Sequence, residues 1–135
     1  TQTYLFLDQV LRQTGTGLPP YAAWGHAGAD WAVDPDIVNN ADPASRATTA
    51  DLLSVPTVSL VMNWNDLFGT GGKGIYIQGA GVPRATSVEL LQPNGSAGFS
   101  INASVEIQGG TSDDRWKDDK LSMQLKFHNP FGPAN

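Results

Sequence analysis

Residues 85–108, ATSVELLQPNGSAGFSINASVEIQ, decide the fold class of this chain. The two flanks, 85–91 and 99–108, alternate apolar and polar residues, which is the period of a strand with one buried face. Between them, residues 93–96 read PNGS, and Asn-Gly between two alternating runs is a strong signal for a tight turn. We therefore predict an antiparallel hairpin here.

Further strands are predicted on both sides of this hairpin. Residues 57–62, TVSLVM, alternate directly after a proline. Residues 120–127 alternate over eight positions, with the apolar side chains on one face. A loop over 63–73 leads to residues 74–77, which would add a fifth strand if they are extended. The fold class that follows is all-β, an antiparallel sheet or sandwich over residues 56–127 with at most short helices.

The N-terminal part of the chain has a different character. Residues 14–50 are rich in Gly and Pro and keep no sustained period of 2 or 3.6, which predicts irregular structure. Residues 3–13 fit either a helical turn after an extended start or a strand, and residues 48–53 fit one capped helical turn. We expect one compact unit, with an irregular wrap over 1–55 and a β-rich region over 56–135.

Charge and composition exclude several classes of function. The formal net charge is -5 and the eight Lys and Arg are scattered, so the cationic surface that binds nucleic acid or anionic membranes is missing. The sequence has no apolar run long enough to span a bilayer and no signal-peptide pattern at its start. Cysteine is absent, which removes thiol catalysis and disulfides. We interpret the chain as a piece of a longer protein.

Several short blocks resemble one known family. The stretch 84–133 is similar to the N-terminal part of bacterial spore-coat CotH kinase-like domains. The blocks that carry this similarity are Ser87-Val88-Glu89-Leu90, Gly98-Phe99-Ser100-Ile101-Asn102-Ala103, Ile107-Gln108-Gly109-Gly110, Lys120-Leu121-Ser122 and Phe131-Gly132-Pro133. Upstream blocks also look like segments that such proteins carry, namely Thr3–Asp8, Asp34–Asn39, Pro56–Leu60, Asp66–Gly69 and Gly74–Tyr76.

The resemblance implies a place for the chain in a larger protein. It would be a non-catalytic, structural or binding portion of an exported bacterial multidomain protein, located outside the cell or in the envelope. Its partners would be the remainder of the parent protein or other envelope proteins. The kinase-like catalytic core of the family is expected beyond Pro133, so we do not expect this chain to be an enzyme alone.

The chain departs from the family where such proteins usually place arginines. At those positions it has Glu106, Asp113 and Gln124, so an anion-binding face would be weakened or reversed. Gly69-Thr70-Gly71-Gly72-Lys73-Gly74 matches the glycine-rich loop of kinases, but the other kinase motifs do not follow it. We favour an inter-strand loop here. Part of a phosphotransferase whose core lies elsewhere remains the second alternative function.

A cluster of Asx residues is the candidate cation site. Irregular loops rich in carboxylate and amide oxygens suit calcium, although the spacing is not that of an EF-hand. The same residue types form turns and helix caps, and we favour that interpretation. No other cofactor is expected. The candidate ligands are Asp30, Asp34, Asp36, Asn39 and Asp42.

Tryptophan is frequent for a chain of this size. An aromatic ring beside Asn and Asp can stack on a sugar, whereas the same ring can also pin a Gly-rich and Pro-rich segment to a core. A carbohydrate-binding or calcium-stabilised extracellular module is therefore the first alternative function. The candidate sugar-binding residues are Trp24, Trp31, Trp64 and Trp116. An unpaired strand edge could in addition join two copies into a homodimer.

Overall fold

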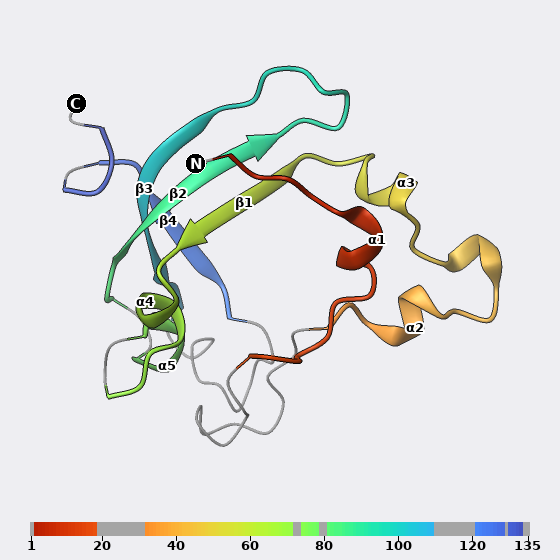
Figure 1. Ribbon diagram of the computed structural model, residues 1–135, viewed down its shortest axis with the longest axis horizontal. Helices are drawn as coiled ribbons and strands as arrows, with labels where there is room; N and C mark the ends of the chain where they lie inside the picture. The colour runs from red at the N-terminus through yellow and green to blue at the C-terminus, as the bar shows by residue number, and fades with distance from the viewer. Residues whose placement is uncertain are drawn as a thin grey trace.

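Four strands form one antiparallel sheet in the order in which they occur along the chain (Figure 1). The computed structural model describes residues 2–18, 32–71, 74–78, 81–109, 121–128 and 130–133. The predicted β-dominated fold with short helices is thereby confirmed. The strands are β1 (Thr57–Met62), β2 (Arg84–Leu91), β3 (Ser100–Ile107) and β4 (Met123–Lys126).

The predicted hairpin joins β2 to β3. Gly95 has a φ of 71°, a left-handed conformation that glycine adopts without strain, and its N–H donates to the Gln92 carbonyl. Gly98 lies so close to β2 that a Cβ there would sit 1.7 Å from the Leu90 carbonyl oxygen. These two glycines therefore fix the turn and allow the strands to pair, with Leu90 donating to Phe99 at 2.9 Å.

The strand pairing separates an apolar face from a polar face. Opposite residues share a face, so Leu60 of β1 lies beside Val88 of β2 and, further on, Val105 lies beside Leu125 of β4. The other face is mainly polar. Its polar residues are Thr57, Ser59, Ser87, Glu89, Ser100, Asn102, Ser104, Glu106, Gln124 and Lys126.

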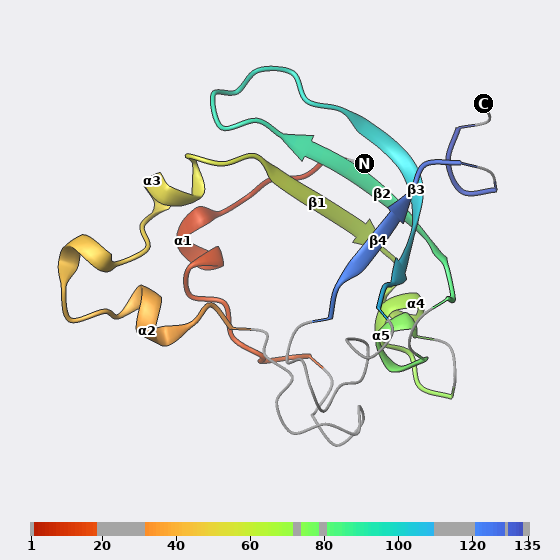
Figure 2. The same ribbon diagram turned by 180° about the vertical axis from the view of Figure 1, so that it is seen from behind.

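Two short helices complete the core at one end of the sheet: α4 (Trp64–Phe68) and α5 (Ile75–Gln78). Figure 2 shows both beside the ends of β1 and β3. Their buried side chains pack with Val105 and Ile107, which are 0% and 1% exposed. The Tyr76 hydroxyl also accepts a hydrogen bond from the Leu121 N–H at 3.2 Å.

The sequence-based expectations differ from the structure at this end. The expected loop over 63–73 contains α4, which begins where the Asn63 side chain accepts the Asn65 N–H. The expectation that 74–77 are extended is wrong, because residues 75–78 form α5. Gly74, Ile75 and Tyr76 are buried consecutively, whereas a strand on a one-sided sheet would expose every second residue.

The described part of the N-terminal region contains four short helices, and none of the four contains a buried residue. They are α1 (Leu7–Val10), α2 (Pro35–Val38), the 3-10 helix η2 (Pro43–Ser45) and α3 (Thr49–Leu52). The helical turn predicted near residue 50 is confirmed as α3, which starts with a capping box of Thr48 and Asp51. Hydrogen bonds from the Thr48 hydroxyl and N–H lower the pKa of the Asp51 carboxyl.

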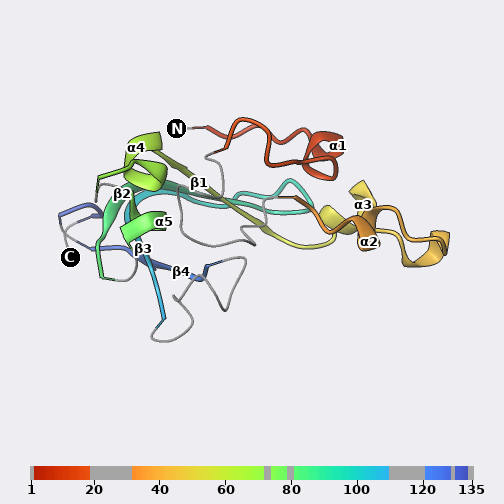
Figure 3. The same cartoon turned by 90° about the horizontal axis from the view of Figure 1, so that it is seen from below.

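The N-terminal segment is tied to the polar face of the sheet. The Thr3 N–H donates to Glu89 Oε2 at 2.7 Å, and the Thr3 hydroxyl lies 2.8 Å from that of Ser59. Figure 3 shows this segment passing over one side of the sheet, while α2 and α3 extend sideways from it. The segment from Thr3 to α1 therefore connects the sheet to the irregular region.

The buried end of β3 should contribute much of the stability. Ile107→Ala removes a fully buried side chain and leaves a cavity, so we expect it to lower the free energy of unfolding by about 2–5 kcal/mol in urea titrations. Val58→Ala, on the half-exposed edge of the same sheet, is the matched control. An equal loss of unfolding free energy from both substitutions would contradict the location of the core at the end of β3.

Candidate functional site

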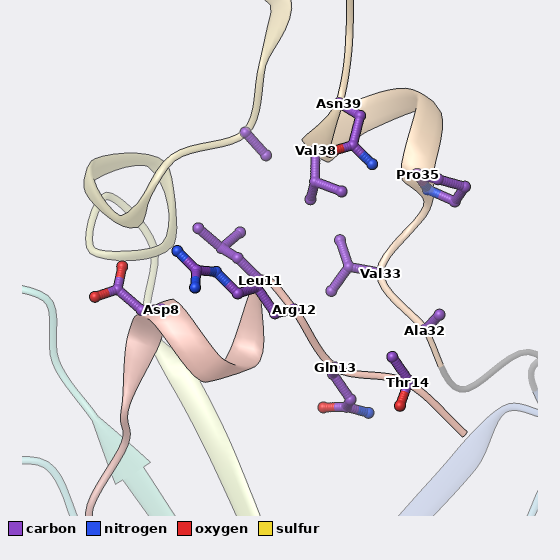
Figure 4. Close-up of a pocket in the computed structure, with 11 residues that line it drawn as sticks. Asp8, Leu11, Arg12, Gln13, Thr14, Ala32, Val33, Pro35, Val38 and Asn39 are labelled. Carbon is purple, nitrogen blue, oxygen red and sulfur yellow. The ribbon is translucent and has the colours of Figure 1, made fainter. Parts of the chain in front are cut away.

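An apolar hollow lies between α1 and α2 (Figure 4). Its volume is about 520 Å³, within the range of small-ligand and side-chain pockets. The Leu11, Val33 and Val38 side chains turn toward one another across it. Ala47 closes part of the wall. The hollow is thus large enough for one or two bulky aliphatic side chains.

Two charged side chains stand beside this aliphatic surface. Asp8 and Arg12 project from the α1 segment and line the hollow. Neither side chain forms a hydrogen bond or an ion pair with any described residue. The hollow therefore combines an apolar floor with one cation and one anion at its edge that are unpaired among the described residues, a combination suited to a polypeptide segment.

Apolar side chains remain exposed near this region. Tyr4 and Phe6 precede α1 and are 72% and 66% exposed, and Leu53 and Val55 follow α3 with about half of their surface exposed. Scattered exposed apolar residues are normal on a surface. In this region they lie in the segments next to α1 and α3, close to the hollow.

A second depression lies on the polar face of the sheet. Two adjoining cavities of about 590 and 380 Å³ share Ser87, Asn102 and Phe131 in their walls. Ser87 and Asn102 are cross-strand partners, and neither side chain has a hydrogen-bond partner among the described residues. The floor therefore offers an amide and a hydroxyl beside an aromatic ring.

Two of the three positions at which the resemblance would place arginines, Glu106 and Gln124, lie on the same polar face. Glu106 is directly opposite Gln124 in the β3–β4 pairing. The Glu106 carboxylate is nearly buried and forms an ion pair with Lys126, at 2.5 Å between Nζ and Oε1. Because this pair is internally neutralised, it attracts an anion weakly. Asp113 lies outside the described residues.

Two of the candidate Asx ligands, Asp34 and Asp42, act as helix caps. The Asp34 side chain accepts from the Asp36 N–H and caps α2, and Asp42 accepts from the Ala44 N–H and caps η2. Asn39 lines the hollow instead. Asp30 lies outside the described residues. Across the described ranges, no three His, Cys, Asp or Glu side chains form a group that could hold a metal.

Of the four tryptophans, only Trp64 belongs to the described residues. Its side chain is 50% exposed and packs edge-on against Phe68, with 4.7 Å between ring centroids. It lines neither the hollow nor the polar depression. Trp24, Trp31 and Trp116 fall outside the described ranges, so their role in sugar binding stays a prediction.

The glycine-rich segment is a closed connection between α4 and α5 where it is described. Gly74 donates to the Gly69 carbonyl at 2.9 Å, and a Cβ on Gly74 would lie 2.5 Å from the Gly69 nitrogen. These glycines are therefore required by close backbone contact. Because the segment joins two helices, the expected inter-strand loop is wrong. Residues 72 and 73 lie outside the described ranges.

Sequence reasoning missed the residues of the hollow. Leu11 and Arg12 lie more than twenty positions from Val33 and Val38 in the sequence. They meet across a segment without sustained hydrophobic period, so no local pattern connects them. The only local pattern near the hollow is that of the apolar residues in 3–13, and this pattern fits a helical turn and a strand equally well.

Comparisons with known proteins add no relative. No family model, no curated protein and no solved structure matches this chain. No helix in the described part of the chain is long and apolar enough to cross a bilayer.

The Asx residues provide a direct test of cap formation against cation binding. Asp34→Ala removes the cap of α2, so we expect a loss of about 1 kcal/mol in the free energy of unfolding, equal with calcium and with chelator. Thermal melts of the unmodified chain and of Asp34→Ala measure this loss. Asp36→Ala, at an exposed neighbouring residue, is the control. A melting temperature of the unmodified chain that rises with calcium would contradict cap formation as the sole role.

Proposed function

We propose that this chain is a non-catalytic docking module of a larger exported CotH-like protein. Its hollow between α1 and α2 receives an apolar polypeptide segment from the remainder of that protein or from another envelope protein. The observation that carries the proposal is the aliphatic hollow with Asp8 and Arg12 at its edge, whose side chains have no partner in the described part of the chain.

The surroundings of the hollow support a macromolecular partner. Tyr4, Phe6, Leu53 and Val55 extend an apolar surface from α1 and α3 beyond the hollow itself. Burial of apolar surface drives most protein association, at roughly 25 cal/mol per Å². Covering these side chains would also give the helices α1–α3 the buried contacts that they lack within the chain.

The polar face supports a structural role over anion recognition. The family resemblance places arginines at positions where this chain has Glu106 and Gln124, and Lys126 is already paired with Glu106. Phosphate groups would meet little free positive charge there. A docking role needs no such charge, because it depends on the apolar hollow on a different part of the molecule.

The test begins with the reading frame that encodes the chain. We expect it to continue into a CotH kinase-like domain, which is then produced separately and titrated into the ¹⁵N-labelled chain. Chemical-shift changes should gather at Leu11, Val33 and Val38. Val38→Asp should weaken binding about tenfold or more, since the complex would bury an unpaired charge.

A matched control lies beside the substituted residue. Ile37→Asp makes the same change on an exposed neighbour that does not line the hollow, and binding should persist. A reading frame without a kinase-like domain would contradict the CotH assignment. Shift changes away from the hollow, or equal losses from both substitutions, would contradict the docking role.

Glycan binding is the second candidate, and the polar depression favours it. Ser87 and Asn102 supply free polar groups, and the Phe131 ring could stack on the apolar face of a sugar. In titrations with neutral tetrasaccharides of glucose or N-acetylglucosamine, Asn102→Ala and Phe131→Ala should each weaken binding about tenfold. Asn65→Ala, outside the depression, is the control. Saccharides that shift only residues elsewhere would exclude this site.

A further inference from the structure

The two edges of the sheet differ in how they are protected from other strands. The β4 edge is four residues long and carries Lys126, and short or charged strands discourage pairing. The β1 edge is six residues long and contains no charge and no proline. Val58 and Val61 are 52% and 45% exposed on its opposite faces. β1 therefore lacks the usual protection of an edge strand.

The hydrogen-bond pattern between the strands identifies the backbone groups of β1 that do not pair with β2. Leu90 donates to Phe99, so the even-numbered residues of β2 direct their N–H and C=O groups toward β3. The odd-numbered residues then face β1, where Glu89 pairs with Ser59 and Ser87 pairs with Val61. It follows that the even-numbered residues of β1 point their backbone groups away from the sheet.

The even-numbered residues of β1 are Val58, Leu60 and Met62, and each has one N–H and one C=O that point away from the sheet. No hydrogen bond links any of these groups to another described residue outside the sheet. The outer edge of β1 therefore presents three evenly spaced donor and acceptor pairs along an uncharged strand.

We propose that this edge pairs with β1 of a second copy, antiparallel and about a two-fold axis at Leu60. Val58 then exchanges hydrogen bonds with Met62 of the partner subunit, and Leu60 with Leu60 of the partner subunit. By symmetry Met62 pairs with Val58 of the partner subunit. This register is self-complementary, and it satisfies every free backbone group of the three residues at once.

The side chains are compatible with this arrangement. The two-fold axis keeps the apolar and polar faces continuous across the new pair, because opposite residues have the same parity. Val61 lies opposite Ser59 of the partner subunit, and the two copies of Val61 are diagonal neighbours at about 7–8 Å. No charged residue of β1 opposes another, so the net charge of -5 on each chain is not concentrated at the junction.

Sedimentation equilibrium of the full chain over a wide range of concentration tests the dimer. The unmodified chain should show a monomer–dimer equilibrium. Val61→Lys places like charges on the diagonal and should weaken dimerisation about tenfold or more. Val55→Lys makes the same change on an exposed valine just outside the paired residues and should leave the equilibrium unchanged. Circular dichroism confirms folding of each variant.

Charge exchange tests the register. Mixing the Val61→Lys and Val61→Glu proteins should restore association as a heterodimer, because opposite charges now meet on the diagonal. Should Val61→Lys lower stability, Val61→Glu alone provides the same test, because its two carboxylates lie on the same diagonal. A monomer at all concentrations would overturn the proposal. Equal effects of Val55→Lys and Val61→Lys, or no heterodimer in the mixture, would assign the β1 edge to another occupant.

Discussion

The burial of β3 on both faces is the constraint on which the rest of the structure depends. From Ala103 to Ile107 every residue of this strand is buried. Val105 and Ile107 contact the helices α4 and α5 on one face, whereas Ser104 and Glu106 lie on the other. A buried carboxylate is costly without a partner, and the ion pair with Lys126 supplies one.

This arrangement gives the molecule one end with a packed apolar core and a remainder with few buried side chains. The core gathers where β3, α4 and α5 meet, so β1 contributes only Leu60 and Met62 to it and keeps its outer edge free. The helices α1–α3 lie farther from this core and bury no residue. In the described part of the chain, the α1/α2 hollow, the polar depression and the β1 edge therefore lie away from this packed core.

The strands could be predicted from the sequence because their apolar and polar residues alternate with a period of 2, even in β3, which is buried on both faces from Ala103 to Ile107. The hairpin was predicted for the same reason, together with Asn94 and Gly95 at its turn. α5 was missed because Ile75 and Tyr76 are buried in succession, which a short apolar run does not reveal. The hollow depends on contacts between distant residues such as Leu11 and Val38, and no local pattern encodes such contacts.

Amide hydrogen exchange in β1, measured by NMR at a concentration where the chain is monomeric, tests the sheet most directly. The account predicts slow exchange at Ser59 and Val61, whose N–H groups point toward β2, and faster exchange at Val58, Leu60 and Met62. Alternating protection of this kind would support both the strand order and the free edge. Uniform protection along β1 in the monomer would contradict the account, because another strand would then have to cover that edge.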